Sequence, residues 1–511
     1  MSDWTAGYVA DIGYTYGYYP ELNPLRVKLA FLNQGLAFPE FGSACELGFG
    51  QGLSANMHAA ASLITWHGND FNPAQAGFAQ ELGAVAGTGA QLSDESFAEF
   101  AARIDLPQFD YIGLHGIWSW ISDDNRTVIV EFIRRRLKVG GVLYISYNTL
   151  PGWAAFAPMR HLLTLHSQVQ GSDGQGIVGR IDSAFDFADK LLATNPGYAR
   201  ANPSIPDRIK KVKEQNRHYV AHEYFNRDWM PMHFATMAEW LEPAKLQFAC
   251  SATHLEHVDP LNLTPDQQSL LKTIGDVTLR ETTRDFMINQ QFRRDYWVRG
   301  ARKLSALEQR DALRALRVLL IVPRTEVSLK VTGAVGEANM SEAVYDPILE
   351  LLSDHKPHTL GQIEQAVRDK GVSFAQVLQS TLVLSGAGHI AGVQDDALAA
   401  KARKQTDKLN AYLMHKARGS QDVAYLASPV TGGGVPVPRF SQLFLAAYMQ
   451  GKKQPVDWVQ PVWQVLEMHS QHLLKDGKEL ATPEENQTEL LAQAKTFAEK
   501  QLPIMKALMV V

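Results

Sequence analysis

The sequence is poor in several features that mark particular classes of protein. Its 511 residues include only two cysteines, Cys45 and Cys250, which form neither a disulfide framework nor a Cys-x-x-Cys pair. We therefore expect a reduced, cytoplasmic protein. The N-terminus lacks the basic and apolar regions of a signal peptide, and no apolar run approaches the roughly 18–20 residues of a membrane span. The net charge of −5 argues against a nucleic-acid partner.

The length and composition predict a multidomain protein with sizeable cores. A chain of 511 residues that is 45% hydrophobic is expected to form roughly two to four domains. The best linker is Gly171–Gly176, and we find no internal repeat.

The most informative stretch is Cys45–Gly52, which contains Gly48, Gly50 and Gly52. A strand-like segment leads into it and a helix-like run, 53–62, leaves it. Glycines permit tight turns and close approach to a ligand, and the following helix presents free N–H groups. The spacing is neither that of a P-loop, which needs Gly-Lys-Ser/Thr, nor that of a G-x-G-x-x-G dinucleotide motif.

Two acidic residues narrow the choice of ligand. Glu46 precedes the first glycine by two positions, and Asp70 follows Gly52 by 18 at the end of an apolar stretch. Asp70 thus has about the spacing at which a second strand offers a carboxylate to ribose hydroxyls. A carboxylate at the position of Glu46 suits a ligand with a cationic group and no phosphate. S-adenosylmethionine (SAM) fits this description.

The surrounding pattern predicts an α/β fold with a doubly wound, mostly parallel sheet. Expected helices begin at Pro24, at Asn72-Pro73 and at Ser122 or Asp123, the last ending with Lys138–Gly141. Expected strands end near Asp94, His115 and Asn148. Ligands bind beyond the carboxyl ends of such strands, where Glu46 and Asp70 also fall.

With these residues in place, Tyr14–Trp153 resembles a class I SAM-dependent methyltransferase with a Rossmann-like sheet. The motifs that carry the resemblance are Glu46–Gly52, Asp70–Pro73, Phe109–His115 and Leu137–Asn148. The tyrosines before Pro20, Ser146–Trp153 and His222–Tyr224 resemble a bacterial group with a methyltransferase regulatory domain, as do Arg284–Phe286, Phe292-Arg293 and Ser428–Gly432. Some members of that group are protein lysine methyltransferases.

The resemblance implies roles at the cofactor. Glu46 and the backbone of Gly48, Gly50 and Gly52 would hold the methionine part of SAM. Asp70 would take the ribose hydroxyls, Phe71 would pack on the adenine, and Asp94 would bind its amino group. We also assign His115 to the cofactor site, and S-adenosylhomocysteine would be the product.

The acceptor is expected to be a lysine, whose amine has a free pKa of about 10.4 and must lose a proton. Aromatic rings can desolvate the amine and receive the methylated cation. The rings that we assign to the substrate are those of Tyr14, Tyr16, Trp118, Tyr147 and Trp153. Tyr18, His115 and Asn148 are the catalytic candidates: Tyr18 in a lid, His115 as a base and Asn148 as an orienting group.

Residues 154–330 are expected to form an inserted and regulatory region that completes the core. Leu246–Cys250 would rejoin the sheet as an antiparallel strand, which places 154–230 over the active site. His222 and Glu223 would line the substrate pocket, but a capped, hydrogen-bonded structural role is favoured over this one. The HExxH zinc motif fails at Asn226, so no metal is expected. Arg284, Arg293, Arg294 and Arg299 are assigned to a helix with a salt-bridged face.

The remaining domains are predicted as a tyrosine-rich lid and helix (1–40), the SAM-binding core (41–153), a winged-helix-like domain (331–400) and a helical domain (401–511). The partner would be a protein substrate, and a homodimer is an open possibility. An O- or N-methyltransferase for a small molecule or surface-glycan precursor is one alternative. A non-catalytic binding module is another.

Overall fold

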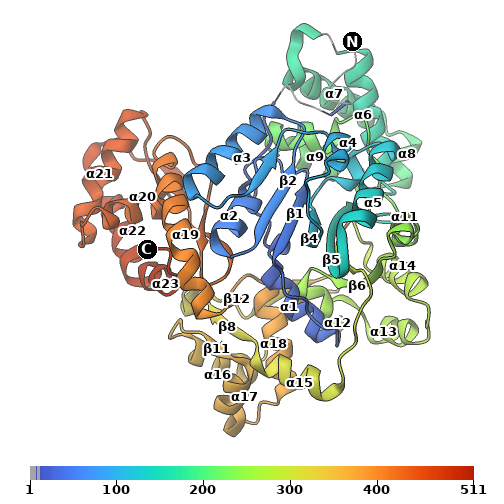
Figure 1. The fold of residues 1–511 in the computed structure, drawn as a ribbon. Coiled ribbons are helices and arrows are strands. Elements are labelled where there is room, and N and C mark those ends of the chain that lie inside the picture. Colours follow the sequence, from blue (N-terminus) through green and yellow to red (C-terminus); the bar gives the residue numbers. More distant parts are fainter. Residues whose placement is uncertain (1–6, 9–11, 172) are drawn as a thin grey trace.

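The centre of the computed structural model, which describes residues 7–8, 12–171 and 173–511, is a seven-stranded sheet (Figure 1). Its order is β3-β2-β1-β4-β5-β7-β6. The strands are β1 Ser43–Leu47, β2 Thr65–Asn69, β3 Gln91–Ser93, β4 Phe109–Leu114, β5 Leu137–Asn148, β6 Gln247–Ser251 and β7 Phe292–Val298. The first five are parallel, and β7 runs antiparallel to its neighbours β5 and β6. The predicted doubly wound fold is confirmed.

Helices cover both faces of this sheet because each presents an apolar side to it. They are α1 Pro24–Asn33, α2 Leu53–Ala61 and α3 Pro73–Ala86 on one face, and α4 Phe97–Ala102, α5 Asp123–Arg136 and α11 Phe234–Leu241 on the other. The predicted caps form: Asn72 accepts the N–H of Ala74, and Ser122 accepts that of Asn125.

Three expectations about the sheet were wrong in detail. Gly140 and Gly141 lie inside β5 and do not cap α5, which ends at Arg136. The strand at 247–251 does rejoin the sheet, but it is the edge strand β6, and the antiparallel member beside β5 is β7. Arg293 and Arg294 therefore lie on a strand, while Arg284 lies on α14 Val277–Ile288. The short run Phe292–Val298 has no clean period, because β7 is buried on both faces.

The inserted segment forms a helical unit with its own core. It contains α6 Ala157–Val169, α7 Gly176–Ala193, α8 Gly197–Ala201, α9 Ile205–Lys213 and α10 Arg217–Tyr224. Met159 and Leu163 of α6 pack in one cluster with Ile181 and Phe185 of α7. The glycine-rich segment 171–176 is thus a connection inside one unit and not a domain linker. After this unit the chain forms α11 and β6, and then α12 Asp259–Asn262, α13 Pro265–Lys272 and α14.

A second sheet, in the order β11-β8-β12, organises the next part of the chain. Its strands are β8 Arg317–Leu320, β11 His358–Thr359 and β12 Ile390–Gly392, and its helices are α15 Ala306–Ala315, α16 Glu342–Leu352, α17 Leu360–Val367 and α18 Phe374–Gly386. A hairpin, formed by β9 Lys330–Gly333 and β10 Gly336–Asn339, lies between β8 and α16 in the sequence. Because β8 belongs to this sheet, the unit begins before the boundary that we predicted at residue 330.

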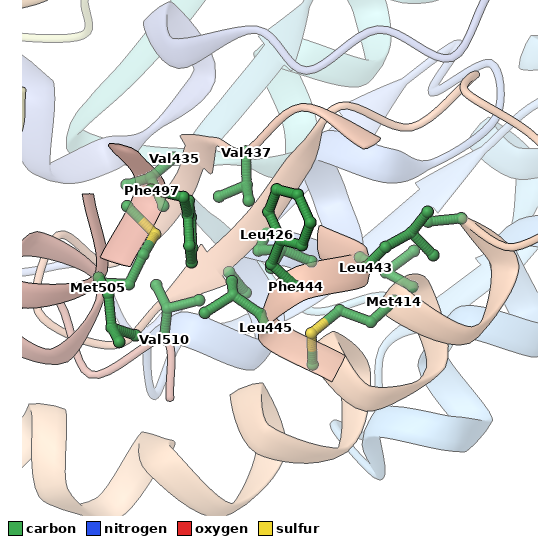
Figure 2. Close-up of a cluster of buried hydrophobic side chains, with 14 of the residues drawn as sticks. Met414, Leu426, Val435, Val437, Leu443, Phe444, Leu445, Phe497, Met505 and Val510 are labelled. Carbon is green, nitrogen blue, oxygen red and sulfur yellow. The ribbon is translucent and has the colours of Figure 1, made fainter. Parts of the chain in front are cut away.

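The C-terminal part packs directly on the fold built around the seven-stranded sheet. It contains α19 Asp396–Lys416, the hairpin β13 Tyr425–Ser428 and β14 Gly433–Pro436, α20 Arg439–Met449, α21 Pro455–Met468, the hairpin β15 Leu474–Lys475 and β16 Lys478–Glu479, α22 Pro483–Thr496 and α23 Leu502–Ala507. Its core, part of which Figure 2 shows around Leu426, Phe444 and Phe497, also includes Leu53 and Met57 of α2 and Leu82 of α3. The first C-terminal helix, α19, therefore lies beside α2 and α3 (Figure 1). No helix in the described ranges is long and apolar enough to span a bilayer.

Candidate functional site

A cavity of about 200 Å3 lies beyond the carboxyl ends of β1, β2 and β4. Three parts of the chain enclose it. The glycine loop after β1 and Asp70-Phe71 after β2 form one wall, and the extended arm of residues 14–19 forms another. His222 and Glu223, from α10 of the inserted unit, close the third side. The sheet edge expected to bind a ligand is therefore hollow and covered.

The glycine loop adopts a backbone that side chains would obstruct. Gly48, Gly50 and Gly52 have φ values of 65°, 58° and 65°, in the left-handed region that favours glycine. A Cβ on Gly48 would lie 2.6 Å from Cδ1 of Ile117, and one on Gly52 would collide with Ala79 of α3. The Gly48 N–H donates to the Asn69 carbonyl at 2.8 Å, which ties the loop to the end of β2. Gly48 and Gly50 line the cavity, and Gly52 starts α2 behind them.

Glu46 is the least satisfied acidic group of the site. Its side chain is 3% exposed, and its Oε2 atom is buried without a hydrogen-bond partner among the described residues. Burial, and secondarily the charge of Asp70, raises the pKa of this carboxyl to about 8. A buried carboxyl that lines a cavity with an unused oxygen is ready to accept a donor from a ligand.

Asp70 holds the loops together while it faces the same cavity. Its carboxylate accepts the N–H of Gly50 at 2.8 Å and the N–H of Asn72 at 3.0 Å. Burial raises its pKa to about 6, and these two hydrogen bonds oppose the shift. Phe71, the next residue, also lines the cavity and meets the Tyr8 ring edge-on, with centroids 5.7 Å apart.

The ionisable side chains that carry charge at this cavity are all acidic among the described residues. Glu46, Asp70, Glu223 and Asp228 line it, and no lysine or arginine does so among the described residues. Buried carboxylates are costly to keep charged, and the raised pKa values of Glu46, Asp70 and Glu223 express that cost. A positively charged ligand would relieve it.

His115 sits at the end of β4 in an aromatic stack. Its Nδ1 atom is 2.7 Å from the Tyr144 hydroxyl, and its ring lies 3.7 Å from that of Tyr19, centroid to centroid. Burial lowers the pKa of His115 to about 3, so the ring is neutral. Within this stack His115 is placed to orient rings and to line the cavity floor.

The inserted helix α10 supplies the opposite wall. The Tyr14 ring meets His222 edge-on with centroids 5.0 Å apart, and His222 Nε2 lies 3.0 Å from the Ile12 carbonyl oxygen. Burial raises the pKa of Glu223 to about 7, while the nearby Arg160 charge opposes the shift. This wall thus combines rings with a carboxyl group that can gain or lose a proton near neutral pH.

Two residues of the predicted lid point away from this cavity. From Thr15 onwards the arm is extended, so neighbouring side chains alternate between its two sides: Thr15, Gly17 and Tyr19 line the cavity, as does Tyr14 before them, whereas Tyr16 and Tyr18 do not. The Tyr18 hydroxyl is hydrogen-bonded to His58 Nε2 at 3.1 Å, and the Tyr16 ring packs on Phe78. The catalytic role expected for Tyr18 and the substrate role expected for Tyr16 therefore have no place in this geometry.

Five other predicted residues also lie outside the cavity lining: Asp94, Trp118, Tyr147, Asn148 and Trp153. Asp94 is exposed, and Ser96 and Phe97 reach the cavity from the same loop.

The other four are buried in packing. Tyr147 donates to Asp295 at 3.0 Å, and the Asn148 N–H donates to Ser119 Oγ at 2.8 Å. Trp118 donates to the Met232 sulfur, and Trp153 packs in the core of the inserted unit. These side chains shape the protein behind the cavity.

Sequence reasoning missed several lining residues. Tyr8, Tyr19, Trp120 and Asn125 line the cavity but carry no motif. Alternation along the arm does not indicate Tyr19, because Tyr14 and Tyr19 both line the cavity. No local signal indicates Trp120, which comes from the segment between β4 and α5. Across the described residues, no group of three or more His, Cys, Asp or Glu side chains is arranged to hold a metal ion.

The chain is similar to known proteins along most of its length. Residues 216–299 match the family model of a predicted methyltransferase regulatory domain. An uncharacterized protein of Synechocystis sp. is 40% identical over 510 residues, which covers 99% of each chain. The structure of PKMT2 from Rickettsia typhi in complex with AdoHcy (S-adenosylhomocysteine) matches with a TM-score of 0.68 at 18% identity. That match covers 95% of this chain and 98% of the Rickettsia chain, and it shows a shared fold.

Proposed function

The chain belongs to the family of the Synechocystis protein, a family of class I SAM-dependent methyltransferases with a methyltransferase regulatory domain, and we propose that it methylates a lysine side chain of a protein. SAM would supply an electrophilic methyl group on a sulfonium. The residues of the chain then have to bind two substrates, align them and exclude water.

The observation that carries this proposal is the cavity lined by carboxylates and rings without a cation. SAM brings an ammonium and a sulfonium, and a lysine brings an ammonium. Positive charge leaves the sulfur and reappears on the acceptor nitrogen during transfer. A site whose ionisable side chains are carboxyl groups, which a bound cation helps to ionise, suits the cation before and after the reaction.

The donor end is assigned to the sheet edge. Glu46 would accept hydrogen bonds from the methionine ammonium through its unused Oε2, while the loop of Gly48 and Gly50 leaves room for the ligand backbone. Asp70 would accept the ribose hydroxyls, and Phe71 would pack on the adenine. Ser96 and Phe97, which line the cavity where Asp94 does not, would contact the base.

The acceptor end is assigned to the arm and α10. Tyr14, Tyr19 and His222 would surround the lysine stem, and Glu223 would receive the proton that the ammonium must lose. A carboxyl with a pKa near 7 is matched to that task at neutral pH. The alternative, a small-molecule or glycan acceptor, has no observation that favours it, since none of the lining residues is specific for a sugar.

The same proposal places the enzyme in the bacterial cytoplasm. Both cysteines are buried and unpaired, which agrees with a reducing compartment. The homodimer stays a prediction.

An incubation with methyl-labelled SAM tests the acceptor. The purified protein is added to a bacterial extract, and labelled protein is hydrolysed and separated into amino acids. The proposal predicts label in methylated lysine that survives mild base, and a preparation with Glu46→Gln gives the background. Label confined to small molecules or glycan, or label in protein that mild base releases, would exclude a lysine acceptor.

A further inference from the structure

A second cavity, of about 420 Å3, lies on the other side of the arm. It is enclosed where α1, the three-stranded sheet β11-β8-β12 and the hairpin β13–β14 meet. The methyltransferase fold, the second sheet and the C-terminal part therefore each contribute a wall. Nothing in the proposed reaction uses this space.

The cavity has one basic group with an unused donor. Arg26 and Lys28 of α1 and Arg317 of β8 line it. Arg317 is paired with Asp396, and Lys28 Nζ lies 5.8 Å from the centroid of the Phe38 ring, whereas Arg26 Nε is buried without a hydrogen-bond partner among the described residues. The two lining carboxylates are engaged elsewhere: Glu21 lies 3.8 Å from Arg294, and Asp395 accepts the Ala397 N–H at 2.9 Å. A half-buried arginine with an unused Nε donor is a feature that an anion would satisfy.

The rest of the lining is apolar, with one neutral histidine. Leu25, Leu316 and Val318 are among the aliphatic residues of the wall. His254 is 1% exposed, and its Nδ1 lies 2.9 Å from Ser385 Oγ. Burial and the charge of Arg26 hold the pKa of His254 well below its usual range, so the histidine ring adds no positive charge of its own. The cavity thus pairs a cationic corner with an apolar body.

The arm connects this cavity with the methyl-donor cavity. Tyr18 lines the second cavity and Tyr19 lines the first, on opposite sides of one extended segment. Tyr18 is fixed by His58 of α2 and by the hairpin, since a Cβ on Gly433 would lie 2.5 Å from its hydroxyl. Tyr19 is stacked on His115. Because the two residues are adjacent, a shift of Tyr18 moves Tyr19.

We propose that the second cavity binds a small organic anion, a phosphate or carboxylate group on an apolar body, and that its occupancy changes the affinity of the first cavity for SAM. The binding half is independent of the proposed function. The coupling half rests on it, because SAM is the readout. Linkage requires that SAM change the affinity for the anion by the same factor.

Calorimetric titration of the full chain tests binding. Phenyl phosphate and benzoate are the two anionic probes, and phenol and inorganic phosphate supply the body and the charge alone. We expect saturable binding of at least one anionic probe and a loss of about tenfold in affinity with Arg26→Gln. Arg26→Lys should retain most of the affinity, and Lys272→Gln on α13, outside the cavity, should retain all of it. The proposal is overturned if neither anion saturates at millimolar concentration, if phenol binds as tightly, or if Arg26→Gln has no effect.

The coupling is tested by titrating SAM with and without the anion that bound. We expect the dissociation constant of SAM to change at least about threefold at saturating anion, and the change to shrink in Tyr18→Phe while the anion still binds. An unchanged SAM affinity with the second cavity filled would remove the coupling. A protein that binds the anion but never SAM would instead contradict the proposed function, so the two failures are distinct.

Discussion

The two ends of the first cavity are built in different ways. The donor end is a sheet edge, where Glu46, the glycine loop and Asp70 follow directly from two adjacent parallel strands. The acceptor end is assembled from an N-terminal arm and α10 of an inserted unit, which meet only in the folded protein. The donor end is held by backbone hydrogen bonds of its own loop, whereas the acceptor end depends on side chains that pack across long sequence separations.

Because the two ends are built differently, we expect one end to bind the methyl donor and the other to determine the acceptor. A backbone cradle with fixed carboxylates recognises one ligand, which is the expectation for a shared methyl donor. Side chains on an arm and an inserted helix can vary without disturbing the sheet, so they are suited to determine the acceptor. Variants on the two ends should therefore change different parameters.

The largest effect is expected at the donor end with Asp70→Ala. The change removes the proposed ribose acceptor and the partner of the Gly50 and Asn72 N–H groups, for a loss of about 2–3 kcal/mol or roughly 30–160-fold in SAM affinity. Calorimetry measures it. Asp94→Ala, which alters an exposed carboxylate outside the cavity, is the matched control and should bind SAM normally. Equal losses in both variants would show that the donor end extends to Asp94.

At the acceptor end, Glu223→Gln should lower kcat about tenfold or more, because the amide cannot take the proton of the ammonium. The dissociation constant of SAM should stay within about twofold, since Glu223 lies on α10 and is assigned to the acceptor. Glu214→Gln, on an exposed residue of the same unit, controls for general damage. A weakened SAM affinity with normal kcat would move Glu223 to the donor end.

The pKa of Glu46 predicts a dependence of stability on pH. The folded protein retains this proton up to about pH 8, whereas the unfolded chain loses it near its ordinary value of about 4.5. The folded state binds more protons in that interval, so this residue makes the free energy of unfolding fall as pH rises from about 5 to 8, by about 1 kcal/mol per pH unit at most. Melting temperatures of the wild type and Glu46→Gln, measured across that interval, give the contribution as their difference. Parallel curves would mean that Glu46 is already ionised.

The smallest effects should distinguish tyrosines on the two sides of the arm. Tyr14→Phe removes a hydroxyl at the cavity and should lower kcat a few-fold, by about 1 kcal/mol. Tyr16→Phe alters a ring that packs on Phe78 outside the cavity, and activity should stay within about twofold. The initial rate of methyl transfer from labelled SAM to the acceptor measures the activity of both variants. A larger loss with Tyr16→Phe would require the arm to move during the reaction.

The sequence predicted most of the cavity lining around the glycine loop, Asp94 excepted, because local chemistry specifies it. Glycines with positive φ, an acid two positions before them and a capped helix after them are visible in a short stretch. It predicted the acceptor end only in part: His222, Glu223 and Tyr14 line the cavity, but Trp118, Tyr147 and Trp153 do not. An aromatic residue near a strand end can face either the cavity or the core, and tertiary packing decides between them. The same non-local packing makes Phe292–Val298 the strand β7, where the sequence predicted a helix.

Calorimetric titration of the wild-type protein with SAM and with S-adenosylhomocysteine tests the central claim most directly, when Glu46→Gln is measured beside it at one pH. The account predicts saturable binding of both ligands at one site per chain, and SAM binding weakened about tenfold or more by the loss of the buried carboxylate. No saturable binding of either ligand, or the same affinity for SAM in Glu46→Gln, would contradict the assignment of this cavity to the methyl donor.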